Sequence, residues 1–259
     1  MNKPTEPILA LNGLTMIFGG LVAVNDFDFY LQPGDLAGLI GPNGAGKTTI
    51  FNMITGQYVP FRGNVVFMDR TLNFLPPHSI TSLGISRTFQ NIRLFGNLSV
   101  LDNVMVSFHM GLKTSFMSAM WRTPKYIFEE KAMKEEGNRL LKAVGLLELS
   151  QEEAKSLPYG QQRRLEIARA LATHPRLLLL DEPAAGMNPH ETQDLMTFIQ
   201  KIREEFNLTI LLIEHDMKVV MGICEKVTVM DFGIKIAEGT PNEIRKNPKV
   251  IEAYLGVEG

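Results

Sequence analysis

The spacing of apolar and polar positions divides the chain into three regions. The first third has short β-rich apolar runs separated by turns that contain glycine or proline, which predicts strands. Strands are expected at residues 8–18, 22–31, 36–40, 64–69 and 71–75, with a helix over 47–56. The run at 36–40 leads directly into a glycine-rich loop that opens this helix.

The middle of the chain, from about residue 100 to 149, has helical spacing with charged and methionine-rich segments. It contains one apolar stripe at positions i, i+1, i+4 and i+7. The members of this stripe are Leu140, Leu141, Val144 and Leu147. We therefore expect a helical subdomain in this region.

The last third alternates strands with helices and ends in an expected helix pair over residues 240–259. Strands are expected at 177–180, 208–213 and 226–230, and helices over 190–205 and from Asp216 onward. Such alternation predicts a mostly parallel sheet with helices on its faces. The helical middle would then be a subdomain inserted into an α/β core.

Residues 41–48 read Gly-Pro-Asn-Gly-Ala-Gly-Lys-Thr and match the phosphate-loop pattern G-x-x-x-x-G-K-[ST] without a substitution. The glycines let backbone N–H groups converge on phosphate oxygens, and the helix N-terminus adds partial positive charge. Lys47 can reach the β- and γ-phosphates, and the Thr48 hydroxyl suits Mg²⁺. The alternative is a glycine turn that caps a helix beside a chance lysine, but both the motif and its strand–loop–helix context favour phosphate binding.

Two acidic residues, Asp181 and Glu182, follow the run of four leucines at residues 177–180. This run predicts a buried parallel strand that neighbours the strand of the phosphate loop. At its carboxyl end, Asp181 can hold Mg²⁺ through water, and Glu182 can polarise an attacking water. The alternative is a pair of solvated acids after a core strand.

Composition narrows the class of protein. With 45% hydrophobic and 21% charged residues among 259, the chain has an ordinary globular balance that excludes wholesale disorder. The net charge of −2 gives no general reason to bind nucleic acid, although a local basic patch stays open. The single cysteine, Cys224, excludes an intramolecular disulfide and is expected to be buried. We expect neither a signal peptide nor a membrane span, so another protein would hold the chain at a membrane.

Residues 157–164 read Leu-Pro-Tyr-Gly-Gln-Gln-Arg-Arg and run into a helical segment. With this peptide, the chain resembles the ATP-binding subunits of ABC transporters over nearly its whole length. That family ideally has Leu-Ser-Gly-Gly-Gln here, so Gly160 and Gln161 match, whereas Pro158 and Tyr159 do not. The resemblance implies that two subunits sandwich two ATP molecules, and that this peptide caps the ATP bound by the partner.

The resemblance also implies roles for single residues. Gln90 matches the glutamine that senses the Mg²⁺ site, and His215 matches the histidine that contacts the γ-phosphate. Phe18 matches the aromatic that stacks on adenine, although an aromatic in a strand otherwise belongs to the core. The implied catalytic residues are Glu182, His215, Lys47 and Gln90, and the implied Mg²⁺ ligands are Thr48, Gln90 and Asp181. The implied ATP contacts are Phe18, Gly41, Pro42, Asn43, Gly44, Ala45, Gly46, Lys47, Thr48, Thr49, Asp181, Tyr159, Gly160 and Gln161.

The fold that the resemblance implies is a P-loop NTPase core with an N-terminal antiparallel β subdomain and an inserted α-helical subdomain. A single ABC ATPase domain would cover 1–259. Its core and β subdomain would take about 1–92 and 172–240, the helical subdomain about 93–171, and the C-terminal helices about 241–259.

Besides Tyr159, three residues depart from the family pattern at the implied subunit contact. Pro158 lacks the hydroxyl and the N–H of the usual serine, although proline is favoured in the first turn of a helix. Ala185 and Asn188 stand where the family usually carries Ser and Asp. A nucleotide switch with negligible hydrolysis therefore stays an alternative to an ATP-driven engine.

Three stretches, at residues 18–25, 159–166 and 184–189, resemble the ATPases of branched-chain amino-acid uptake systems. The insertion between Asn103 and Glu136, with Trp121 and Arg122, fits too. Urea and amide importers and the lipopolysaccharide-export ATPase share parts of this pattern. A non-transport ABC ATPase is the competing class, but the chain lacks the second phosphate loop or sustained heptads that such proteins usually carry.

The resemblance implies two cofactors, ATP and Mg²⁺, and several partners. These partners are integral-membrane permease subunits, a second ATPase subunit that is identical or related, and indirectly a substrate-binding protein. No nucleic acid is expected among them. The implied location is the cytoplasmic face of the cell membrane.

Overall fold

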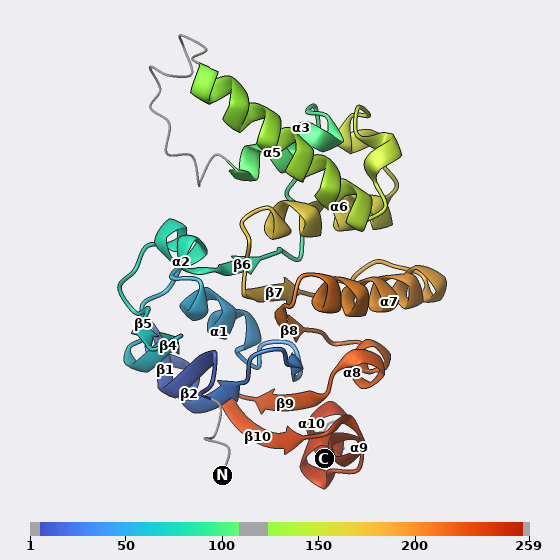
Figure 1. Cartoon of the computed structure of the whole chain (residues 1–259). Coiled ribbons are helices and arrows are strands. Elements are labelled where there is room, and N and C mark those ends of the chain that lie inside the picture. Colours follow the sequence, from blue (N-terminus) through green and yellow to red (C-terminus); the bar gives the residue numbers. More distant parts are fainter. Residues whose placement is uncertain (1–5, 109–123, 256–259) are drawn as a thin grey trace, which may run out of the picture. The chain divides into compact units, whose positions relative to one another are not determined.

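A computed structural model describes residues 6–108 and 124–255 (Figure 1). The chain divides into two compact units. One unit, called the core unit below, combines residues up to 90 with those from 176 on, and the other, the helical unit, comprises residues 91–175. Trp121 and Arg122 lie outside the described residues, so the expectation for that insertion stays a prediction. No helix within 6–108 and 124–255 is long and apolar enough to cross a lipid bilayer.

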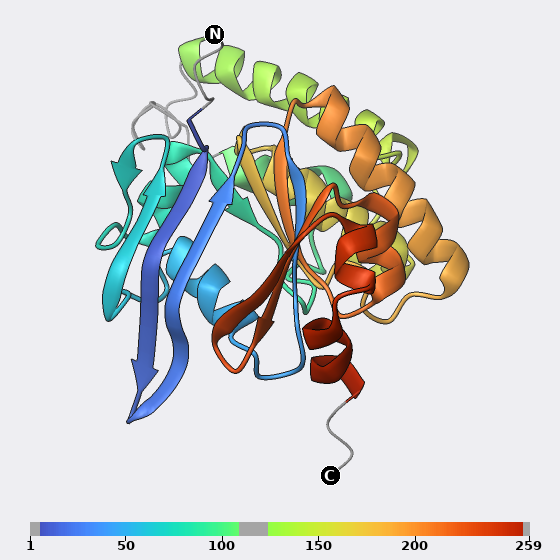
Figure 2. The ribbon, with the colours of Figure 1, turned by 90° about the horizontal axis from the view of Figure 1, so that it is seen from below.

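The core unit begins with an antiparallel sheet in the strand order β2-β1-β4-β5. Its strands are β1 (Leu9–Phe18), β2 (Leu21–Leu31), β4 (Arg62–Phe67) and β5 (Arg70–Thr71). β1 and β2 form a long hairpin (Figure 2), whose turn residues Gly19 and Gly20 have φ angles of 53° and 96°. The strand expected at 71–75 is reduced to two residues, because the Asn73 side chain bonds the backbone of Val65 and Gly63 instead.

The second sheet of the core unit is mostly parallel, with the strand order β10-β9-β3-β8-β7-β6. Its strands are β3 (Leu36–Ile40), β6 (Ile85–Arg87), β7 (Leu177–Asp181), β8 (Thr209–Ile213), β9 (Lys226–Asp231) and β10 (Ile234–Gly239). Only β9 and β10 pair antiparallel. The predicted α/β class, with an antiparallel N-terminal sheet and an inserted helical part, is confirmed.

One expectation about this sheet was wrong. β7, which carries Asp181, does not neighbour β3, because β8 pairs with both strands and lies between them. All three strands run in parallel, so their carboxyl ends still meet at one edge of the sheet. In an open parallel sheet, this edge is where ligands bind.

Helix α1 (Lys47–Ile54) packs between the two sheets. Its apolar side chains share one buried cluster with residues of both sheets, including Ile50, Phe51, Ile54, Leu11, Phe27, Leu39, Leu179 and Leu211. α7 (Pro189–Glu205) and α8 (Met217–Ile223) cover the other face of the parallel sheet (Figure 2). Because α1 is held by close packing on both sides, its N-terminus and the loop before it are fixed relative to the sheet edge.

The remaining helices of the core unit are short. They are α2 (Pro77–Leu83), α9 (Pro241–Arg245) and α10 (Pro248–Leu255). The last two provide the helix pair that was expected near the C-terminus. Cys224, at the end of α8, is buried as expected, and its sulfur would lie 3.1 Å from a Cβ built on Gly38 of β3. Burial raises the pKa of its thiol.

The helical unit contains α3 (Val100–Phe108), α5 (Pro124–Ala143), two 3₁₀ turns (Leu147–Leu149 and Ala154–Ser156) and α6 (Tyr159–Leu171). Leu140, Leu141 and Val144 are buried, as the apolar stripe predicts. The stripe does not extend to Leu147, because α5 ends at Ala143 and Gly145 turns the chain with a φ of 76°. Leu146 is buried instead.

Candidate functional site

The phosphate loop joins β3 to α1, and glycine is required at both of its ends. A Cβ on Gly41 would lie 2.1 Å from the carbonyl oxygen of Met230, so no other residue fits there. Gly46, the residue before α1, has a φ of 102°. A Cβ on it would lie 2.6 Å from the carbonyl oxygen of Ala23. The loop is therefore shaped by backbone that approaches from two neighbouring strands.

The N-terminus of α1 is open to an anion. Its first intrahelical bond runs from the Ile50 N–H to the Gly46 oxygen, at 3.1 Å. The N–H groups of Lys47, Thr48 and Thr49 therefore have no acceptor within the helix. No side chain caps this end and no acidic residue lies in its first turn. Free N–H groups and the helix dipole together favour a phosphate here.

Lys47 is only 6% exposed, and the carbonyl oxygens of its own loop hold its ammonium. Its Nζ donates to the Gly41 oxygen at 2.7 Å and to the Pro42 oxygen at 2.8 Å. Burial lowers the pKa of Lys47, while the negative charges of Glu182 and Asp181 act in the opposite direction. Because the ammonium is partly desolvated, an anionic phosphate would interact with it more strongly than in bulk water.

Glu182, which follows β7, lies beside Gln90, which comes after β6, and His215, which comes after β8. The Gln90 amide nitrogen donates to Glu182 Oε2 at 2.7 Å, and His215 Nδ1 lies 3.5 Å from the same oxygen. The Glu182 backbone has a φ of 46°, in the left-handed region that is uncommon for residues other than glycine. No hydrogen bond to Glu182 Oε1 is formed within the described part of the chain. That oxygen is available to accept a proton from water.

Asp181 forms a buried ion pair with Arg87, a residue that the sequence analysis did not single out. Arg87 NH2 lies 2.5 Å from Asp181 Oδ2, and NH1 donates to Asn52 Oδ1 at 2.7 Å. The guanidinium also lies 5.4 Å from the ring centres of Phe51 and Phe89. The available signal was the position of Arg87, three residues before Gln90 in the sequence. The pair fixes the Asp181 carboxylate at the end of β7.

The available oxygen ligands suit Mg²⁺. The Thr48 side chain is exposed, and within the described residues its hydroxyl has no hydrogen-bond partner. Asp181 and Gln90 offer a carboxylate and an amide oxygen. The described part of the chain holds no group of three or more His, Cys, Asp or Glu residues that would form an all-protein metal site. This pattern fits Mg²⁺, which usually keeps several waters and binds through substrate phosphates and one or two protein ligands.

Phe18, predicted to stack on adenine, ends β1 outside the core. Its side chain is 39% exposed, so the alternative that it is a core residue is removed. It meets Tyr58 edge to face, with ring centres 5.2 Å apart at 72°. Tyr58, which follows α1, was not predicted to contribute here.

The residues predicted to cap a partner's ATP belong to the helical unit. α6 begins at Tyr159, with Pro158 as the residue before its first turn, so the predicted helix start is confirmed. The Pro158 oxygen accepts the N–H of Gln161 at 2.9 Å. Tyr159 is exposed, and a Cβ on Gly160 would meet no atom within 4 Å. This end of α6 therefore has room for a ligand.

A network of buried charges ties α6 to the start of the helical unit. Arg163 is fully buried, and it donates to Glu166 Oε2 at 2.6 Å and to the Tyr159 hydroxyl at 3.3 Å. The Arg93 N–H lies 3.5 Å from Glu166 Oε1. Arg169 donates to the Arg93 carbonyl oxygen. Sequence reasoning missed this network, because charged residues on a helix are usually solvated.

Replacing Glu166 by alanine is expected to lower the free energy of unfolding by about 3–5 kcal/mol, because Arg163 would keep a buried charge without its partner. Urea unfolding measured by circular dichroism would test this. Glu148→Ala, at an exposed acid of the same unit, is the matched control and should stay within about 0.5 kcal/mol of wild type. A loss below about 1 kcal/mol for Glu166→Ala would show that water screens the pair.

Asn188, which departs from the family pattern, has a local role. Its Oδ1 accepts the N–H groups of His190 and Glu191 at 3.0 Å each. In return, Glu191 Oε2 accepts the Asn188 N–H at 2.9 Å. This capping box starts α7, and asparagine serves as well as aspartate at such a position.

Comparison with known proteins agrees with this geometry. Residues 24–185 match the family model described as "ABC transporter", and residues 235–259 match the model described as "Branched-chain amino acid ATP-binding cassette transporter". A crystal structure of an ATP-binding cassette of an ABC transporter in its ADP conformation superposes with a TM-score of 0.85. The two chains are 30% identical, and the match covers 97% of this chain and all of that one.

Two curated relatives define the position within the family. The high-affinity branched-chain amino acid transport ATP-binding protein LivG of Escherichia coli is 48% identical over 97% of this chain and 99% of its own. The lipopolysaccharide export system ATP-binding protein LptB of the same species is 34% identical over 96% and 97%. The chain belongs to the ATP-binding proteins of ABC transporters and is an ATPase of that class. Within the class, it lies with the branched-chain amino acid members.

Proposed function

We propose that this ATPase powers the uptake of branched-chain amino acids through an ABC transporter. ATP hydrolysis is supported by one observation: Glu182, Gln90 and His215 cluster at the sheet edge where the phosphate loop also lies. The substrate class rests on the match of residues 235–259 and on the greater identity to LivG than to LptB. A urea or amide importer, or a lipopolysaccharide exporter, has less support.

The catalytic residues act in a defined order in this proposal. Lys47 turns from the carbonyl oxygens of its loop to the β- and γ-phosphates, while the N–H groups of residues 47–49 bind phosphate oxygens. Glu182 then orients a water toward the γ-phosphate and accepts its proton, and Gln90 keeps the carboxylate in place. His215 donates a hydrogen bond to the phosphate as its charge develops.

The Mg²⁺ ion would be held by Thr48, together with Gln90 and Asp181 directly or through water, and it would neutralise charge on the β- and γ-phosphates. Phe18 packs on the adenine ring. Because stacking does not read the edge of a base, this contact does not distinguish ATP from GTP.

The working unit in this proposal is a pair of ATPase subunits, and the two units of each chain act as one ATPase domain. Tyr159, Gly160 and Gln161 of one subunit cap the ATP bound by its partner. Residues 91–97 receive a cytoplasmic helix of a permease subunit, which places the pair at the cytoplasmic face of the membrane. The buried network around Glu166 supports this, because it joins the Tyr159 end of α6 to Arg93.

Affinity purification of the tagged chain from detergent-solubilised membranes of its host tests the assembly. We expect two different multi-span proteins and a second, similar ATPase to co-purify. Reconstituted in proteoliposomes with the matching binding protein, the complex should take up labelled L-leucine when ATP is supplied, and it should not take up urea. Recovery of the chain without any membrane protein would contradict the transporter, and uptake of urea alone would contradict the substrate class.

A further inference from the structure

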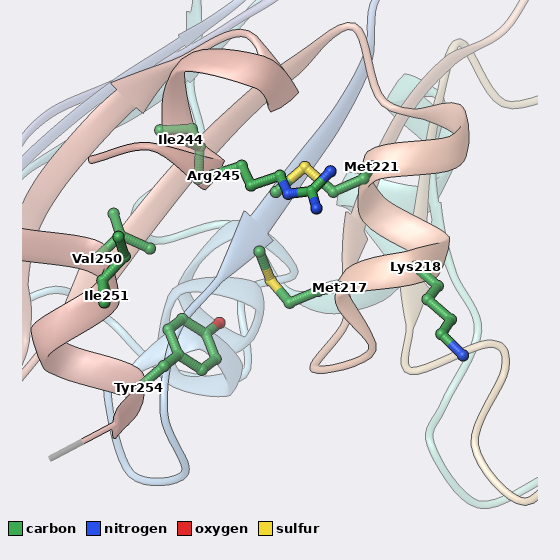
Figure 3. A pocket seen from close by; sticks show the side chains of 8 residues that line it. All are labelled: Met217, Lys218, Met221, Ile244, Arg245, Val250, Ile251 and Tyr254. Atoms are coloured by element: carbon green, nitrogen blue, oxygen red, sulfur yellow. The ribbon is translucent and has the colours of Figure 1, made fainter. Parts of the chain in front are cut away.

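A pocket lies between α8 and the two C-terminal helices, outside the site described above (Figure 3). It has a volume of about 510 Å³, within the range of small-molecule sites. Its walls are mainly apolar and are formed by Met217, Met221, Ile244, Val250, Ile251 and the ring of Tyr254. Methionine and branched side chains of this kind favour a compact aliphatic group.

The charged residues that line the pocket, among those the structure describes, are both basic. They are Arg245 and Lys218, and none of the described lining residues is acidic. The guanidinium of Arg245 lies beside Met221, whereas the ammonium of Lys218 points away from the pocket (Figure 3). The Arg245 side chain forms no ion pair or hydrogen bond with the residues that the structure describes. A planar guanidinium without a partner is suited to a carboxylate, and the absence of an acid among the lining residues disfavours a ligand with an ammonium group.

Tyr254 connects this pocket to the phosphate loop. Its ring forms part of the pocket wall, and burial raises the pKa of its hydroxyl to about 12, while the nearby Gly41 N–H acts in the opposite direction. The carbonyl oxygen of the same Gly41 accepts from Lys47 Nζ at 2.7 Å. Gly41 therefore lies between the Tyr254 hydroxyl and the Lys47 ammonium. A ligand that moves Tyr254 would act on the position of Lys47.

The walls formed by α9 and α10 lie in the part of the chain that matches the branched-chain family model. Ile244, Arg245, Val250, Ile251 and Tyr254 all fall within residues 235–259, which match the branched-chain model. The general ABC transporter model ends at residue 185. The wall formed by α9 and α10 therefore lies within the match to the branched-chain model and outside the match to the general one.

We propose that this pocket is an effector site for a branched aliphatic carboxylate without an ammonium group, and that its occupation slows ATP turnover through Tyr254 and Gly41. The 2-oxo acid left when a branched-chain amino acid loses its amino group belongs to this class, as does a short branched fatty acid. The link to amino-acid supply rests on the proposed transport function. Binding itself depends only on the pocket.

Isothermal titration of the purified full-length chain would test the site with 4-methyl-2-oxopentanoate, 4-methylpentanoate, L-leucine and the uncharged 4-methylpentan-1-ol. We expect saturable binding of one or both carboxylates, with L-leucine and the alcohol at least about tenfold weaker. Binding of the oxo acid alone would identify the product of amino-group removal, and equal binding of both would identify the shared carboxylate. Absence of saturable carboxylate binding, or equal binding of the alcohol, would overturn the site.

Two variants and a matched control separate ligand binding at the pocket from its effect on ATP turnover. Arg245→Gln should weaken carboxylate binding by about tenfold or more, and Lys218→Gln, at a cation that points away, should not change it.

In ATPase assays, the saturating ligand should slow the wild type and Lys218→Gln by about fivefold. Tyr254→Phe should still bind the ligand but lose this response. A full response in Tyr254→Phe would overturn the coupling, and unchanged binding in Arg245→Gln would overturn the site. Since no transport is measured, a wrong transport substrate cannot produce either result.

Discussion

Glu182→Gln is expected to bind ATP with wild-type affinity and to hydrolyse it about 10²- to 10⁴-fold more slowly. The substitution keeps the size of the side chain and an oxygen that can accept the Gln90 hydrogen bond, which spans 2.7 Å in the wild type. It removes the carboxylate that accepts the proton of the attacking water. Because the phosphate contacts come from the loop and from α1, binding of ATP does not depend on this carboxylate.

The measurement is a pair of assays on one preparation: equilibrium binding of ATP, and phosphate release at saturating ATP with the membrane partners present. Glu205→Gln, at an exposed acid near the end of α7, is the matched control and should equal the wild type in both. Wild-type turnover in Glu182→Gln would show that another group accepts the proton. A wild-type chain without measurable turnover would instead favour the nucleotide switch that the departures at Pro158 and Asn188 left open.

The local sequence carried enough information for the elements around the phosphate site. The strand at 36–40 was predicted with its observed bounds, because an apolar run that ends in glycine has few other structures available. The meeting of Glu182, Gln90 and His215 came from the resemblance, since they lie on separate segments and no spacing rule joins them. The same holds for the roles proposed for these residues.

Elements that depend on distant partners were not predictable in this way. The Asp181–Arg87 pair joins residues that are 94 positions apart. β6 was missed because its three residues form a strand only by pairing with β7. The short β5 reflects the Asn73 side chain, which takes over backbone bonds that a longer strand would have made. Each of these outcomes was decided by tertiary contacts, which local propensity does not contain.

The order of the parallel strands was also not predictable from local patterning. The sequence predicts that β3, β7 and β8 are parallel and buried, but hydrophobic patterning does not tell which two are neighbours. β8, which follows β7 in the chain, pairs with both and separates them. The functional expectation survived this error, because parallel strands bring their carboxyl ends to one edge whatever their order.

Lys47→Ala is expected to lower the affinity for ATP by about 100-fold and to leave no measurable hydrolysis. In the wild type this ammonium is buried and held by the Gly41 and Pro42 oxygens, and it exchanges these partners for the phosphates when ATP binds. The loss should be much smaller for AMP, which lacks the β- and γ-phosphates that Lys47 reaches. This difference separates a lost phosphate contact from a collapsed loop, which would weaken the binding of both nucleotides equally.

Lys134→Ala, at an exposed lysine of the helical unit, is the matched control. Full ATP affinity in Lys47→Ala would show that the lysine only supports the loop, and the proposed catalytic order would then be wrong at its first step.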